Sequence, residues 1–220
     1  MLRKGVLAVL LLSAWSAAQP APCSVDLPPQ RKVAENVIDA LHTPVETIEV
    51  DSAFKYVGAE RFILYNIADA ELHLFVNADK DGLVHRLYWV QFEGYLPNDP
   101  QRHHNYTSPK HVQMAGLQFV VDTGTEKYTE PPDPGSDGER MRKMLAAKGY
   151  KLPAEAASVR LVHLPDADQR NELMFIYAED LAPSGYRADD LAPKGAHADK
   201  WEAMSEALVR RGTTGLLIRR

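Results

Sequence analysis

The sequence has a single cysteine, Cys23, among its 220 residues, so no disulfide bond can form within the chain. The domain therefore has to be stable without one. Its 45% hydrophobic content and its length are sufficient for such a core. A lipid anchor on Cys23 is not predicted, because Pro20 and Pro22 occupy the positions at which a bacterial lipoprotein signal has a leucine and a small residue.

Long hydrophobic runs are also absent. The apolar run at residues 6–12 is well short of the roughly 20 residues that cross a bilayer. It follows Arg3 and Lys4 and leads to small residues that end at Ala18, an order typical of a secretory signal peptide. We therefore predict a cleaved signal peptide at 1–18, a flexible leader at 19–30 and a single domain at 31–220, located in the periplasm or outside the cell.

Basic residues are in the minority. Removal of residues 1–18 takes away Arg3 and Lys4 and leaves 23 basic against 30 acidic side chains, a formal charge of −7. Because an acidic surface is repelled by phosphate backbones, nucleic acid is not an expected partner. The mature chain also contains no further apolar run long enough for a transmembrane span.

Familiar catalytic motifs are missing as well. The sequence has no G-x-S-x-G elbow, H-E-x-x-H helix, phosphate-binding loop or dinucleotide-binding glycine pattern. No motif predicts a bound cofactor.

The first part of the domain predicts a helix followed by strands. Val33, Val37, Ile38 and Leu41 have helical spacing in "RKVAENVIDALHTP", with Pro44 as a stop. From residue 45 the β-branched and aromatic residues favour strands, with a turn expected at Gly58.

The clearest expected element is a hairpin over residues 70–96, with a type I′ turn at Asp81-Gly82. This turn predicts that Val76 faces Leu87, Leu74 faces Trp89 and Leu72 faces Gln91 on one side of the hairpin. On the other side it pairs Phe75 with Tyr88 and His73 with Val90. Both sides are apolar, so we expect the hairpin in the middle of a sheet that is covered on each face.

Further elements complete an α+β pattern. A strand is expected at 114–122 and a polar loop at 123–139, followed by a helix with a capping box formed by Ser136 and Glu139. A second hairpin is expected over 158–179, and a C-terminal helix has an apolar stripe of Trp201, Met204 and Leu208. The predicted fold is a mainly antiparallel, twisted sheet of about six strands packed with two or three helices.

Asp122 is a candidate catalytic residue, since "FVVDTGT" resembles the active-site signature of aspartic proteases. That chemistry requires two aspartates that share a proton. The chain has one copy, so a homodimer would have to supply the second. The alternative interpretation is a strand that runs into a turn, because Asp, Thr and Gly are common in turns.

The segment "NDPQRHHNYTSPKH", residues 98–111, contains the candidate metal ligands His103, His104 and His111. Imidazoles bind zinc or copper, but no fixed spacing in this loop requires it, and a solvated loop is the alternative. Tyr88, Trp89, Phe92 and Tyr95 lie just before the loop and are candidate ligand-binding residues, with core packing as the alternative.

Two functional hypotheses follow. The first is an exported module that binds a small molecule or another envelope protein. The second is an exported hydrolase that uses either a metal at the histidine loop or the Asp122 carboxylate.

Overall fold

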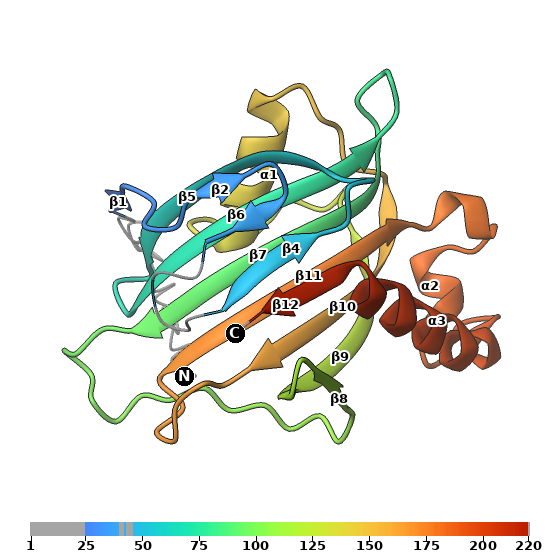
Figure 1. Cartoon of the computed structure of the whole chain (residues 1–220). Helices are drawn as coiled ribbons and strands as arrows, with labels where there is room; N and C mark the ends of the chain where they lie inside the picture. The colour runs from blue at the N-terminus through green and yellow to red at the C-terminus, as the bar shows by residue number, and fades with distance from the viewer. Residues whose placement is uncertain (1–24, 40–41, 43–45, 220) are drawn as a thin grey trace, which may run out of the picture.

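The computed structural model describes residues 25–39, 42 and 46–219. In this part of the chain, twelve strands form two antiparallel sheets of eight and four strands. The large sheet has the order β1-β5-β6-β7-β11-β10-β9-β8 (Figure 1). Its strands are β1 (Asp26–Leu27), β5 (Lys55–Leu64), β6 (Ala68–Ala78), β7 (Val84–Tyr95), β11 (Asn171–Asp180), β10 (Glu155–His163), β9 (Leu117–Lys127) and β8 (His111–Met114).

The small sheet has the order β12-β4-β3-β2. Its strands are β12 (Leu216–Arg219), β4 (Thr47–Val50), β3 (Val37–Ile38) and β2 (Val33–Ala34). The helices are α1 (Asp137–Ala147), α2 (Ala188–Leu191) and α3 (Trp201–Thr214), with short 3₁₀ turns at Ala182–Ser184 and Ala198–Lys200. The predicted α+β class and antiparallel pairing are confirmed, whereas the estimate of about six strands was too low. No helix in the described residues is long and apolar enough to cross a membrane.

Two apolar cores cover the two faces of the large sheet. The first core joins the sheet to the small sheet and α3, and it includes Phe75, Tyr88 and Val90. The second core lies under α1 and includes Leu74 and Trp89. Figure 1 shows the small sheet and α3 on one side of the large sheet and α1 on the other. The hairpin β6–β7 therefore lies in the middle of a sheet that is covered on both faces, as its two apolar sides predict.

The predicted register of that hairpin is confirmed at all five residue pairs. The turn itself is different. Among its central residues only Gly82 has positive φ, at 81°, and the N–H of Gly82 donates to the carbonyl of Asp79. A type I′ turn needs positive φ at both central residues, so this connection is a longer turn, and the register shifts between Asn77 and Ala78.

The predicted helix over residues 31–44 was wrong where the structure describes it. Val33–Ala34 and Val37–Ile38 pair as a small hairpin, with Glu35 at φ 54° in its turn. The Asn36 side chain donates to the carbonyls of Asp51 and Phe54, which fixes this turn against β4. β-branched residues fit a strand at least as well as a helix, so pairing with the neighbouring strands determines which of the two forms. Leu41 lies outside the described residues.

Four other features of the strands differ from the predictions. Gly58 lies within β5, where the register shifts, and makes no turn. The expected strand over 114–122 is divided by a tight turn at Ala115-Gly116, so β9 continues through the Asp-Thr-Gly sequence to Lys127. β12 was not predicted. Asp26 and Leu27, in the expected leader, pair with β5 as β1.

The N-terminal cap of α1 follows the predicted pattern in part, and the predicted apolar stripe of α3 faces the first core. The Ser136 hydroxyl accepts the N–H of Glu139 at 3.0 Å, as the predicted capping box requires, whereas the Glu139 carboxylate accepts the N–H of Gly135 in place of that of Ser136. Gly149, at φ 82°, closes the C-terminal end. In α3, Leu208 is buried in the first core, and Trp201 and Met204 pack against it.

Candidate metal site

Glu93 and Glu172 are directly paired across the central strands β7 and β11. Directly opposed residues of an antiparallel pair project from the same face of the sheet. Both carboxylates therefore lie on the face of the second core, in line with Trp89 and Gln91. Glu172 is buried and Glu93 is half-buried. Two adjacent carboxyl groups on an otherwise apolar face are electrostatically unfavourable unless a proton or a cation joins them.

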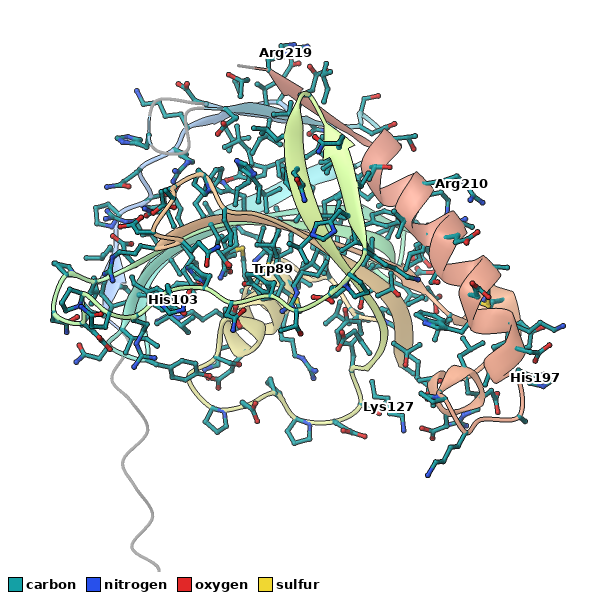
Figure 2. The ribbon with its side chains drawn as sticks, turned by 90° about the horizontal axis from the view of Figure 1, so that it is seen from below. Trp89, His103, Lys127, His197, Arg210 and Arg219 are labelled. Carbon is teal, nitrogen blue, oxygen red and sulfur yellow. The ribbon has the colours of Figure 1, made fainter. Side chains whose placement is uncertain are left out.

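The histidine loop crosses this face and adds two more polar groups. The Nδ1 atom of His104 lies 3.1 Å from a carboxylate oxygen of Glu172, and both side chains are only 4% exposed. The Tyr106 hydroxyl donates a hydrogen bond to the same oxygen. The ring of Tyr95 stacks on His104 with 4.4 Å between centroids. Figure 2 shows the loop that carries His103 running across the molecule, with α1 and α3 on opposite sides of the sheet.

Burial changes the protonation of this cluster. Burial, together with the nearby charges of Glu172 and Asp137, raises the pKa of Glu93 to about 8. Burial also raises the pKa of Glu172, and it lowers the pKa of His104 to about 4. At neutral pH the imidazole is therefore uncharged, which is the form that binds metals, and Glu93 retains a proton that a cation could replace.

Glu93, His104 and Glu172 can hold one metal ion. Each offers one ligand atom, and these atoms lie within 4.8 Å of one another. The second ring nitrogen of His104, Nε2, is buried without a hydrogen-bond partner. Two carboxylates and a neutral imidazole would balance the charge of a divalent ion in a buried site, and this donor set suits first-row transition metals.

The surrounding residues orient one of the carboxylates. Gln91 donates through Nε2 to Glu93 at 3.0 Å and to Asp137 at 3.3 Å. Trp89 in turn donates to the side-chain oxygen of Gln91 at 2.9 Å, which fixes the amide. Outer hydrogen bonds of this kind hold metal ligands in place.

The predicted site residues are only partly brought together. His104 joins the cluster, whereas His103 and His111 are exposed and contact the carbonyls of Gln101 and Pro109. Asp122 lies inside β9, where its carboxylate accepts a hydrogen bond of 2.7 Å from Arg160.

The four aromatic candidates divide between the two faces. Tyr88 is buried in the first core and donates to the carbonyl of Gly212 at 3.0 Å. Phe92 is on the same face, with the Arg31 guanidinium 3.5 Å above its ring. Trp89 and Tyr95 lie on the opposite face, beside the carboxylate pair. They form no common binding surface.

A second polar cluster lies on the first face. The buried carboxylate of Glu71 accepts hydrogen bonds from the backbone of Gln30 and Arg31 and from Nε2 of His73 at 3.0 Å. The other ring nitrogen of His73 lies 3.3 Å from the Tyr56 hydroxyl. Gln30, Arg31 and Glu71 border a cavity of about 290 Å³ whose lining also includes Arg61, Asp69 and Gly94. Glu71 thus anchors the N-terminal segment to the sheet.

Sequence reasoning missed Glu93 and Glu172. The signal that could have found Glu93 is the side-chain alternation of β7, which places it on the same face as Trp89 and Gln91. The pairing with Glu172 depends on how two separate hairpins dock. Local sequence patterns do not predict that docking. No family model, curated protein or solved structure matches the chain.

Proposed function

We propose that the protein is an exported binding module whose ligand is a divalent metal ion held by Glu93, His104 and Glu172. The observation that carries this proposal is the convergence of three ligand atoms, one from each of these side chains, within 4.8 Å of one another. The exported location rests on the predicted signal peptide at 1–18, which lies outside the described residues.

The test is calorimetric titration of chelator-treated protein with Zn²⁺ and Mn²⁺. We expect one ion per chain for the wild type and at least a tenfold weaker affinity for Glu172→Gln and for His104→Gln, since each removes one of three ligands. His103→Ala and His111→Ala are matched controls because they change exposed histidines of the same loop, and they should bind like the wild type. Absence of binding to the wild type, or equal losses in the controls, would refute the proposal.

An exported hydrolase is the second candidate, favoured by one observation. Glu93 and Glu172 are paired carboxyl groups, and Glu93 with a pKa of about 8 is a proton donor at neutral pH. The test is hydrolysis of a panel of nitrophenyl glycosides and esters with and without added metal. Activity that is lost in Glu93→Gln supports this candidate, and no turnover by the wild type removes it.

A further inference from the structure

The Arg170 side chain donates four hydrogen bonds to backbone carbonyls, two just before the histidine loop of residues 98–111 and two within it. Its Nη1 donates to the carbonyls of Asp99 and Arg102 at 2.9 and 2.8 Å, and its Nη2 donates to those of Tyr95 and Leu96 at 3.1 and 2.9 Å. The carbonyl of Arg170 also accepts the N–H of Tyr95 at 3.0 Å. The planar guanidinium is the side chain that can serve several acceptors with a fixed geometry.

Arg170 is itself held in place by its own turn. It lies at the tip of the β10–β11 hairpin, where the Asp166 carboxylate accepts the backbone N–H groups of Arg170 and Asn171 at 3.1 Å each. The preceding residue, Gln169, has positive φ of 55°, and its carbonyl accepts the N–H of His104 at 2.8 Å. One turn thus holds both the loop and the backbone of the candidate metal ligand.

Arg170 lies between the parts of the chain that carry Glu172 and His104. Glu172 follows Arg170 by two residues on β11, and Tyr95, which stacks on His104, is both a donor to and an acceptor from Arg170. Loss of the guanidinium would free the carbonyls of 95–102 to find other partners and would release His104 from its position over Glu172.

We propose that Arg170 is the positioning residue that closes the histidine loop over the Glu93–His104–Glu172 cluster and so governs how tightly and how long the metal ion is held. This inference rests on the proposed metal-binding function. The Arg170 guanidinium donates only to backbone carbonyls at residues 95–102, so it acts through the position of His104.

The experiment compares Arg170→Gln and Arg170→Lys with Arg61→Gln. Arg61 is the matched control, because it donates two hydrogen bonds to Asp69 on the opposite face of the sheet, so its loss perturbs the fold without contacting the loop. Zn²⁺ affinity is measured by titration, and ion release is followed by stopped-flow mixing with a chelator, both far below the melting temperatures of all variants. Hydrogen exchange of the metal-free proteins reports on residues 96–105.

We expect Arg170→Gln to raise Kd by about 10- to 100-fold, mainly through faster release, as for other residues that orient metal ligands. Arg170→Lys should restore part of the affinity, and Arg61→Gln should bind like the wild type. The amides of 96–105 should exchange faster in Arg170→Gln alone.

Failure of the proposed function and failure of the inference about Arg170 give different results. A wild-type protein that binds no ion overturns the proposed function and the inference with it. A wild type that binds, with an Arg170→Gln variant of equal affinity, overturns the inference alone. Equal exchange protection of 96–105 in the wild type and Arg170→Gln does the same, with or without metal.

Discussion

Glu93 and Glu172 face each other on β7 and β11, and burial raises the pKa of both carboxyl groups. The pKa of Glu71, which is also buried, shifts in the opposite direction. There, burial acts to raise the pKa, but hydrogen bonds from His73 and from the backbone of Arg31 and Gln30 outweigh it and lower the pKa. At the residue scale, Glu93 and Glu71 therefore give opposite dependences of stability on pH.

The Glu93 carboxyl group should reduce stability as the pH rises. Its pKa of about 8 in the folded state exceeds that of an unfolded glutamate, so the folded protein binds more protons between these values and loses stability as the pH rises through 8. In the presence of a chelator, Glu93→Gln should be more stable than the wild type by about 1–3 kcal/mol at pH 9 and equal to it near pH 4. Urea unfolding at several pH values measures this gap, which should be absent for the exposed control Glu206→Gln.

Glu71→Gln should destabilise the protein at neutral pH by on the order of 3 kcal/mol, because it leaves buried donors without their charged acceptor. Since the folded pKa of Glu71 is lowered, its contribution is complete above the unfolded value of about 4.5 and is lost as the pH falls through the folded pKa. The gap between variant and wild type should therefore shrink in acid. Glu49→Gln, which breaks an ion pair with Arg219 at the surface, is the control and should cost under about 1 kcal/mol. A gap of constant size from pH 3 to pH 7 would contradict the assignment.

At the scale of elements, the β6–β7 turn docks against the end of α1. The carbonyl of Gly82 accepts the N–H of Lys151 at 2.8 Å, and Leu83 forms a parallel bridge with Lys151. A Cβ atom on Gly82 would lie 2.5 Å from the carbonyl oxygen of Gly149. Here glycine is required both by its positive φ and by a close backbone approach.

Alanine substitutions can separate the cost of positive φ from the cost of the close backbone approach. Gly116 in the β8–β9 turn has nearly the same φ, 79°, but nothing lies within 4 Å of an added Cβ. We expect Gly116→Ala to cost roughly 1–2 kcal/mol from backbone strain and Gly82→Ala roughly 2–4 kcal/mol, because the neighbouring backbone must also move. Thermal unfolding of both variants measures the difference. Equal costs would show that the docking contact is unimportant.

At the scale of the whole molecule, the sequence predicts local pairing better than assembly. The facing residues Leu74–Trp89 and Phe75–Tyr88 follow from alternation and from the position of one turn. Two-residue strands such as Val33–Ala34 carry too few residues for any periodicity, and Val37 and Ile38 fit a helical stripe equally well. The loop histidine His104 was a candidate from composition, but its partners Glu93 and Glu172 depend on the docking of β7 on β11.

The predicted signal peptide can be tested on the whole chain. If the signal peptide is cleaved after Ala18, the mature protein begins at Gln19. Expression of the full sequence in a bacterial host, followed by N-terminal sequencing and intact mass measurement of the periplasmic fraction, should find this terminus. Full-length protein retained in the cytoplasm would refute the prediction.

The pairing of β7 with β11 has a kinetic consequence. Each strand belongs to a hairpin with local contacts, whereas the seam between them joins distant segments and carries the entropy cost of closing a long loop. Glu93 and Glu172 lie on opposite sides of this seam, so the proposed ligand set exists only after the hairpins have docked. A bound ion would then stabilise the docked seam and slow its opening, because the ion holds one ligand from each hairpin.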